Sequence, residues 1–364
     1  MTVFGTGRRE ASGLSGGPDG GAPAPGRERE RAEQDRLRER VETGLARIEE
    51  LLRREVAYAD EIAADTTSYL LTAGGKRVRP MLTILASEFG EDPGGEDVLV
   101  AGAAVEITHL ASLYHDDVMD EADLRRGVPA AHLNWGNSVA ILAGDLLFAR
   151  SSLLFTGLGT RCIELQSRTF ERLVLGQMRE TVGPREGEDR IEHYLRVLAD
   201  KTGSLIAAAA QFGAICGRAP DPYVPALAAY GEAVGVAFQI VDDVIDLSPR
   251  SETTGKLAGT DIRAGVETLP VLRLERQAGT DERAAELLER IRERVAGSDP
   301  QDPEEHERVA GIVEELRRHP VTEATRSEAA AWADRAVAAL DPLPDGAAKR
   351  ALVRFARDIV ERDH

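Results

Sequence analysis

The stretch Val98–Glu121 reads VLVAGAAVEITHLASLYHDDVMDE and is apolar through most of its length. A helix that is apolar nearly all round belongs inside a large helical bundle. Strict alternation of apolar and polar residues is scarce, and aromatic residues make up only 4% of the chain, which favours helices over strands. The sequence therefore predicts an all-α fold. Further long apolar stretches are Asn137–Phe155, Leu195–Cys216 and Ala226–Leu247.

Composition divides the chain into a tail and one large domain. Residues 1–32 are rich in Gly, Pro, Arg and Ser. Such a composition cannot bury apolar area, so this tail is predicted to be disordered. Helical spacing of apolar residues begins at Leu37 and continues through Val41 and Leu45. We therefore expect a single all-α domain over residues 33–364.

Charge and cysteine content exclude several classes of protein. The formal net charge of −18 argues against a nucleic-acid binder. No secretory signal is visible, and we expect no apolar run to be long and uniform enough to cross a bilayer. Cys162 and Cys216 cannot form a disulfide framework and lack metal-site spacing, so inert thiols in a reducing cytoplasm are expected. So acidic a chain needs bound cations or a local basic cluster to bind an anion.

Two groups of aspartates follow apolar stretches with the same spacing. The first is Asp116, Asp117 and Asp120. Like charges one helix turn apart repel, and negative charge at a helix C-terminus opposes the helix dipole. One such group could arise by chance as a solvated helix end, but two indicate compensating cations. An all-oxygen ligand set suits Mg²⁺ shared with substrate phosphates. The second group is Asp242, Asp243 and Asp246.

Basic residues near these groups are candidates for phosphate binding. The loop Gly74–Pro80 reads GGKRVRP and leads into a predicted helix, whose N-terminus favours an anion. The pair Arg125-Arg126 follows the first aspartate group and could bind phosphate in bidentate fashion. A solvated basic loop is the alternative. The loop supplies Lys76, Arg77 and Arg79.

Three weaker candidates complete this set. Lys201-Thr202 and Lys256 could reach a phosphate, although each lysine alone is an ordinary surface residue. His109 precedes Asp116 by two helix turns and lies on a similar face. A lone histidine in an apolar helix is more often a core residue than a ligand, but its direction toward the aspartates favours a role in the site.

The chain resembles the trans-isoprenyl diphosphate synthase (polyprenyl synthetase) family over nearly all of residues 40–360, and is most like bacterial long-chain polyprenyl diphosphate synthases. Six motifs occur in the family's order, and the paired aspartate motifs are the most specific. They are Gly74–Pro80, Glu106–Asp120 with Arg125–Gly127, Gly144-Asp145, Lys201-Thr202, Phe238–Asp246 and Gly255-Lys256.

The resemblance implies a fold and a role for each candidate. The fold is an isoprenoid-synthase helical bundle around a central cavity, across which the two clusters face each other. Asp116, Asp120 and Asp242 would hold Mg²⁺ on the allylic diphosphate, with Asp117, Asp243 and Asp246 in support. Arg125, Lys201 and Lys256 would bind that diphosphate. Lys76, Arg79, His109 and Arg126 would bind isopentenyl diphosphate, and Thr202 and Gln239 would help place the reacting groups.

The implied activity is a Mg²⁺-dependent prenyltransferase reaction. Isopentenyl diphosphate units are added to an allylic diphosphate with release of pyrophosphate, to give a long chain for a quinone side chain. The resemblance also suggests a homodimer, whose product could pass to a membrane prenyltransferase. The alternatives are a shorter-chain synthase making geranyl, farnesyl or geranylgeranyl diphosphate, a class I terpene cyclase, and a noncatalytic partner subunit.

Small residues before the first aspartate group predict a long product. Ala111 and Ser112 lie about one turn before Asp116, where an aromatic ring would close the path of the growing chain. Small side chains at both positions leave that path open. One departure from the family pattern is Val266, which stands where many members carry a lysine.

Overall fold

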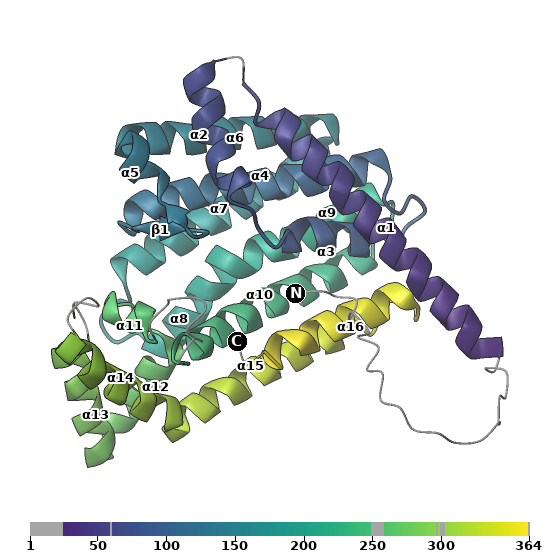
Figure 1. Cartoon of the computed structure of the whole chain (residues 1–364). Coiled ribbons are helices and arrows are strands. Elements are labelled where there is room, and N and C mark those ends of the chain that lie inside the picture. The colour runs from purple at the N-terminus through teal and green to yellow at the C-terminus, as the bar shows by residue number, and fades with distance from the viewer. Residues whose placement is uncertain (1–24, 59, 249–257, 296–297, 299–302, 363–364) are drawn as a thin grey trace, which may run out of the picture. The chain divides into compact units, whose positions relative to one another are not determined.

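The computed structural model describes residues 25–58, 60–248, 258–295, 298 and 303–362. These residues are almost wholly helical (Figure 1). The strands of the described part, β1 (Leu124–Arg125) and β2 (Val128–Pro129), pair antiparallel. The predicted all-α fold is therefore confirmed. The predicted arrangement of the two aspartate groups across a central cavity stays a prediction.

The chain divides into two compact units, which we describe separately. Unit 1 comprises the described residues up to 168 together with 208–228 and 340–355, and unit 2 comprises 169–207, 229–339 and 356–362. The expected single domain over residues 33–364 stays a prediction.

Unit 1 contains α1 (Pro25–Glu55), α2 (Glu61–Thr72), α3 (Val78–Ser87), α4 (Glu96–Met119), α5 (Ala131–Trp135) and α6 (Asn137–Gly157). Unit 2 contains α8 (Arg190–Leu198), the π-helix η1 (Ala199–Gly203), α11 (Thr260–Arg263), α12 (Leu269–Ala278), α13 (Glu282–Arg294), α14 (Pro303–Arg318) and α15 (Pro320–Ala339). Residues of α7 (Thr160–Val182), α9 (Ser204–Cys216), α10 (Tyr223–Asp246) and α16 (Ala347–Val360) belong to both.

The first helix begins earlier than the sequence suggested. We expected disorder up to residue 32, but α1 starts at Pro25. The stretch from residue 28 is rich in Glu and Arg, which are good helix formers. Glu33 also accepts a hydrogen bond from the Ala347 backbone N–H at 3.0 Å and pairs with Arg350 at 3.2 Å. These contacts order the start of the helix, so the boundary at residue 32 is wrong. The rest of the predicted tail, residues 1–24, lies outside the described residues.

In unit 1, the apolar helix α4 packs closely against α6. A Cβ atom added at Gly144 would lie 3.2 Å from the Ala111 carbonyl oxygen, so glycine allows this approach. The Thr108 and Ser151 hydroxyls, one from each helix, form a buried hydrogen bond of 2.6 Å. This packing fixes the C-terminal part of α4, which carries the first aspartate group.

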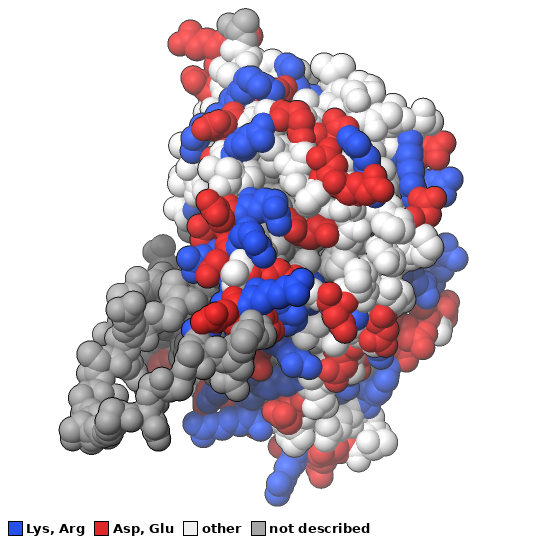
Figure 2. All heavy atoms as spheres, turned by 90° about the vertical axis from the view of Figure 1, so that its right-hand side faces the viewer, with Lys and Arg blue, Asp and Glu red and all other residues white. Residues whose placement is uncertain are grey.

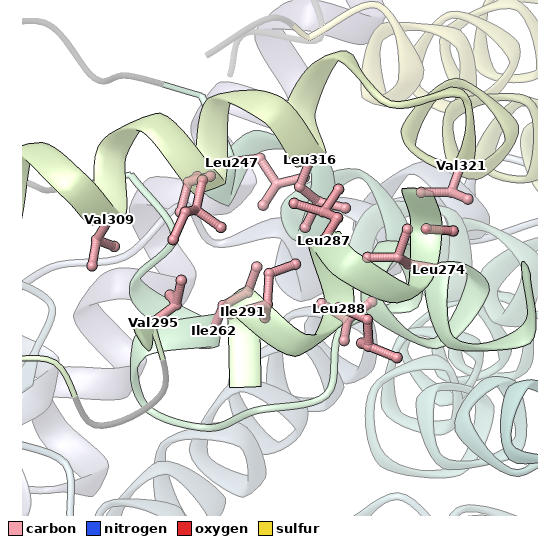
Figure 3. Packing of buried hydrophobic residues seen from close by; sticks show 14 residues of the cluster. Leu247, Ile262, Leu274, Leu287, Leu288, Ile291, Val295, Val309, Leu316 and Val321 are labelled. Carbon is pink, nitrogen blue, oxygen red and sulfur yellow. The ribbon is translucent and has the colours of Figure 1, made fainter. Parts of the chain in front are cut away.

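In unit 2, a cluster of aliphatic side chains joins α11, α12, α13 and α14 (Figure 3). Leu274, Leu287 and Ile291 are among its buried members, and Leu247 also belongs to it. Because Leu247 directly follows Asp246, this core holds the chain that leaves the second aspartate group.

Three helices of the described chain are long and apolar enough, by length and composition, to cross a membrane: α4, α6 and α10. The expectation that no apolar run reaches this length is wrong by that measure. In α4 and α10, 78% and 61% of the apolar window is buried within the protein, but in α6 only 33% is buried. Most of the apolar surface of α4 and α10 is therefore used in the interior, whereas α6 leaves much of its own exposed.

The surface carries charges of both signs, and the two cysteines are buried. On the face drawn in Figure 2, Lys and Arg side chains are interspersed with Asp and Glu side chains. One of the ion pairs in unit 1 joins Arg40 Nε to Glu88 Oε1 at 2.6 Å. Cys162 and Cys216 are both buried and do not form a disulfide. Their sulfur atoms are 3.8 Å apart.

Candidate active site

The first cluster (Asp116, Asp117 and Asp120) lies at the C-terminal end of α4. The Asp120 backbone N–H donates to the Asp116 carbonyl at 2.8 Å, so these two residues are one helix turn apart as predicted. Asp120 is exposed, Asp116 is half-buried and Asp117 is fully buried. Glu121 then adopts a left-handed conformation with φ of 49°, which ends the helix.

A short hairpin returns two arginines to this cluster. Arg126 and Gly127 have φ values of 55° and 81° and form the two-residue turn between β1 and β2. The Arg125 Nε–H donates to Asp117 Oδ1 at 2.6 Å. Asp117 Oδ2 is buried without a hydrogen-bond partner among the described residues. Burial raises the pKa of Asp117, while the nearby Arg125 opposes that rise.

Three arginines surround one buried carboxylate beside this hairpin. Arg77, Arg79 and Arg126, here called the arginine group, all lie close to Glu106 of α4, which is 2% exposed. Burial raises the pKa of Glu106 and the three arginines oppose that rise. Arg77 also pairs with Glu49, and because two carboxylates cannot balance three guanidinium groups, the net charge here is positive. This charge suits an anionic ligand.

The members of the arginine group have different partners. Arg77 donates from Nε to Glu49 at 2.9 Å and from Nη1 to Glu106 at 3.2 Å. Arg126 donates to the carbonyls of Leu70, at 2.8 Å, and Gly74. In contrast, Arg79 Nε is buried without a hydrogen-bond partner among the described residues. Burial lowers the Arg79 pKa to about 10, so the group stays charged at neutral pH.

The other predicted residues of this region lie around the arginine group. The pKa of the half-buried His109 is well below its usual value, because of burial and of Arg79 and Arg126 nearby, so the ring is neutral. Lys76 is exposed in the loop before α3. The structure thus brings Lys76, Arg79, His109 and Arg126 to one region of unit 1, next to the first cluster. The buried Ala111 and Ser112 lie between His109 and that cluster on α4.

The second cluster (Asp242, Asp243 and Asp246) lies at the C-terminal end of α10, in unit 2. Asp243 Oδ2 accepts hydrogen bonds from the Tyr194 hydroxyl at 2.6 Å and the Leu269 N–H at 3.0 Å. Burial raises the Asp243 pKa to about 7. Asp246 Oδ2 accepts from the Asp261 N–H at 3.1 Å. All three contacts come from segments distant in the sequence.

An arginine near the C-terminus lies beside this cluster. The Arg362 guanidinium is 4.9 Å from the centre of the Phe238 ring, one helix turn before Asp242. Burial lowers the pKa of Arg362, and the nearby carboxylate of Asp242 opposes that effect. Gln239, on the same helix turn as Phe238, is half-buried.

Lys201 and Thr202 lie in η1, where the helix widens by one residue per turn. A Cβ atom at Gly176 would lie 2.7 Å from the backbone nitrogen of Lys201. Helix α7 can therefore approach this turn so closely only with glycine at position 176. Asp200 pairs with Arg172, at 2.9 Å, and with Arg179, and Lys201 pairs with Glu180. Lys256 lies outside the described residues.

The residues present fit magnesium shared with a diphosphate. Among the described residues, no three His, Cys, Asp or Glu side chains are arranged to hold a metal by themselves. Mg²⁺ commonly takes one or two carboxylates and completes its shell with phosphate oxygens and water. The unpartnered oxygen of Asp117 and the exposed Asp120 supply carboxylate oxygen of this kind. Such a shared site needs the substrate to be complete.

Sequence reasoning missed three residues of these surroundings. Arg77 was grouped with the phosphate-binding cations, but its guanidinium pairs with Glu49 and Glu106. The signal was Glu106 itself, because a carboxylate within an apolar helix needs a buried partner. Tyr194 and Arg362 contact the second cluster from far along the chain, and no spacing in the sequence reveals such contacts.

Comparisons with known proteins agree with these observations. Residues 60–310 match the model of the polyprenyl synthetase family. A nonaprenyl diphosphate synthase of Mycobacterium tuberculosis is 44% identical over 322 residues, which cover 88% of this chain and 93% of that protein. A Corynebacterium glutamicum geranylgeranyl pyrophosphate synthase, complexed with calcium and isoprenyl diphosphate, has a TM-score of 0.76 and 43% identity, covering 90% of this chain and 97% of that one. A Rhodobacter capsulatus decaprenyl diphosphate synthase has a TM-score of 0.77 and 36% identity, with 91% and 99% coverage. The chain therefore belongs to the polyprenyl synthetase family and is a prenyltransferase.

Proposed function

We propose that this enzyme is a Mg²⁺-dependent trans-polyprenyl diphosphate synthase that adds isopentenyl diphosphate units to an allylic diphosphate and releases pyrophosphate. The observation that carries the proposal is the arginine group beside the first cluster. A site with excess positive charge next to carboxylates suits two anionic substrates, one bound by cations and one shared with a metal. A terpene cyclase binds a single diphosphate and has no need of this second site.

The residues of unit 1 have two tasks. Arg79 and Arg126, with Lys76 at the loop, bind the diphosphate of isopentenyl diphosphate, and the neutral His109 can donate one hydrogen bond to it. Asp116 and Asp120 would hold magnesium, with Asp117 kept in place by Arg125. Bound magnesium stabilises the negative charge that builds on the departing diphosphate.

The residues of unit 2 act on the allylic substrate. Asp242 would hold magnesium with Asp246 in support, and Lys201 binds the allylic diphosphate after leaving its ion pair with Glu180. Thr202 and Gln239 help to place the reacting groups. No side chain need act as a strong base, because the departed diphosphate can take the proton lost after condensation.

We infer a long product, for a quinone side chain. Ala111 and Ser112 are small, and both are buried just before the first cluster. Two of the similar proteins are named for nonaprenyl and decaprenyl products, which supports this length. The similar synthase named for geranylgeranyl pyrophosphate favours the shorter alternative.

We further propose that the enzyme works in the cytoplasm as a homodimer and passes its product to a membrane prenyltransferase. An apolar stripe on α6 supports the dimer. Leu142 and Leu153 are each 60% exposed and Leu146 is 38% exposed, at positions that share one face of the helix. Sedimentation of the wild-type enzyme and of Leu142→Asp would test the stripe, since a charge there should separate the copies.

One experiment tests the activity and the product together. The purified enzyme is incubated with labelled isopentenyl diphosphate and an allylic starter, with MgCl₂ or with EDTA. Pyrophosphate release and chain length are measured, the latter by chromatography against standards. The proposal expects Mg²⁺-dependent release and a product of roughly six to nine isoprene units, as a continuous apolar path would allow. No release with any starter would overturn the activity, and a product of fifteen or twenty carbons would overturn the length alone.

A further inference from the structure

We propose that Tyr194 is a positioning residue of the second cluster: its hydroxyl holds Asp243 and so fixes how the end of α10 presents Asp242 and Asp246. The inference rests on the proposed function, in which Asp242 would hold magnesium with Asp246 in support. Tyr194 is not expected to touch the substrates or the metal, because its hydroxyl is engaged with Asp243 at 2.6 Å.

The contact joins a half-buried tyrosine to a buried aspartate that has two donors. Asp243 is 4% exposed, and the same carboxylate oxygen accepts a second hydrogen bond, of 3.0 Å, from the Leu269 N–H. Tyr194 belongs to α8 and Leu269 to the start of α12. A buried carboxylate with fewer donors would be strongly unfavourable, so the surrounding interior is built to hold Asp243 in one place.

Holding Asp243 constrains its neighbours. Successive residues of a helix are about 100° apart, so Asp242 and Asp246 lie on one face and Asp243 beside it. The last turn of a helix has carbonyls without partners inside the helix. In α10 the Asp246 carbonyl accepts a hydrogen bond from the Gly259 N–H at 2.7 Å, and the fixed Asp243 side chain is a second anchor in the same turn. Asp243 therefore helps to prevent this turn from rotating. The two outer carboxylates then keep one direction before any ligand binds.

The same hydrogen bond connects two parts of the proposed allylic site. Helix α8 continues directly into η1, which carries Lys201 and Thr202. The other end of this segment is held by Asp200, which pairs with Arg172 and Arg179. Tyr194 of α8 contacts the second cluster, so it links the segment that carries Lys201 to the segment that carries the aspartates.

The test is Tyr194→Phe, which removes only the hydroxyl. The residues that support metal ligands typically change metal affinity or activity by about 10–100-fold when replaced. We expect a turnover loss in that range and a matching rise in the Mg²⁺ concentration for half-maximal rate. The KM for isopentenyl diphosphate should stay within about twofold. Tyr194 acts at the second cluster, so its loss should leave the binding of isopentenyl diphosphate at its own site unchanged. Tyr230→Phe is the matched control, since Tyr230 is a second tyrosine of unit 2, is fully buried and lies on α10 itself.

A second readout does not depend on turnover. Inorganic pyrophosphate with MgCl₂ should raise the Tm of the wild-type enzyme and of Tyr230→Phe equally, and that of Tyr194→Phe by less. A double-mutant cycle with Asp243→Asn then asks whether the tyrosine acts through this aspartate. Adding Tyr194→Phe to Asp243→Asn should cost little more than Asp243→Asn alone.

The outcomes are distinct. Wild-type Mg²⁺ dependence and a wild-type pyrophosphate response in Tyr194→Phe would overturn the proposal, and so would full additivity in the cycle. If Tyr194→Phe does not fold, Tyr194→His, which keeps a hydrogen-bond donor, is used in the pyrophosphate measurement instead. A rise in its Tm no nearer the wild-type rise than that of Asp243→Asn would likewise overturn the proposal. Failure of the proposed function has a different signature, because the wild-type enzyme would then release no pyrophosphate from its two substrates.

Discussion

The two aspartate clusters have the same spacing in the sequence but different neighbours in the structure. The buried middle aspartate of the first cluster, Asp117, is paired with a cation, Arg125. Its counterpart Asp243 is held by neutral donors, the Tyr194 hydroxyl and a backbone N–H. The first arrangement places a positive charge against its aspartate, whereas the second supplies no charge, and burial raises the pKa of Asp243 to about 7. The two clusters are therefore expected to differ in how much cation they need and in how they respond to loss of a partner.

The largest effects should come from the outer aspartates, where the clusters are expected to be alike. Asp116→Ala and Asp242→Ala should each lower turnover by orders of magnitude, because a lost metal ligand removes several kcal/mol of charge stabilisation. Both side chains are only half-buried, so the fold should survive. Turnover at saturating MgCl₂ and circular dichroism are the measurements. Near-normal turnover in either folded variant would remove that cluster from the mechanism.

The next prediction separates the clusters by the partner of the middle aspartate. Arg125→Gln leaves the fully buried Asp117 without its cation, and should lower the free energy of unfolding by about 1–3 kcal/mol. Arg125 is partly exposed, at 29%, which keeps the loss below that of a wholly buried pair. Tyr194→Phe removes a neutral donor and should cost less. Urea denaturation of both variants gives the comparison.

Arg47→Gln is the control for this pair of variants. Its ion pair with Glu96 is exposed on both sides, at 51% and 63%, and should be worth less than about 1 kcal/mol. If Arg125→Gln were no more destabilising than Arg47→Gln, the proposed difference between the clusters would be wrong.

The sequence predicted more of the ligands than of their supports. Helices such as α4 and α10 were predictable because their apolar character is local, and so were the aspartates at their ends. Arg125 was also within reach, being eight residues from Asp117. Tyr194 and Asp243 are 49 residues apart, so only the packing of α8 against the end of α10 brings them together. The left-handed backbone of Arg77 and Arg126 was equally hidden, because nothing in the residue type of arginine requires a positive φ.

A smaller effect should distinguish the two substrates. Arg79→Ala should raise the KM for isopentenyl diphosphate by about 10- to 150-fold, because a charged hydrogen bond worth roughly 1.5–3 kcal/mol is lost. Lys201→Ala should act mainly on the allylic partner, and by less, since the lysine must first leave Glu180. Initial rates with each substrate varied in turn give both constants. Equal changes for both substrates in both variants would contradict the division of roles between the clusters.

The smallest effect on rate, but a clear one on product, is expected before the first cluster. Ala111→Phe places a ring five residues before Asp116, where it should block the growing chain and shorten the product. Ala111 is fully buried and its carbonyl faces Gly144, so overpacking should cost about 1–3 kcal/mol and folding must be checked by circular dichroism first.

The matched control lies at the same place before the second cluster. Ala237 precedes Asp242 by five residues and is 1% exposed, so Ala237→Phe adds the same ring at the same distance from an aspartate and at a similar cost in packing. If chain length is set beside the first cluster alone, Ala111→Phe should shorten the product and Ala237→Phe should not. A folded, active Ala111→Phe enzyme with the wild-type product would refute the blocking model. Shortening by both rings would mean that the path of the chain passes both clusters, and that the small residues before Asp116 do not set its length by themselves.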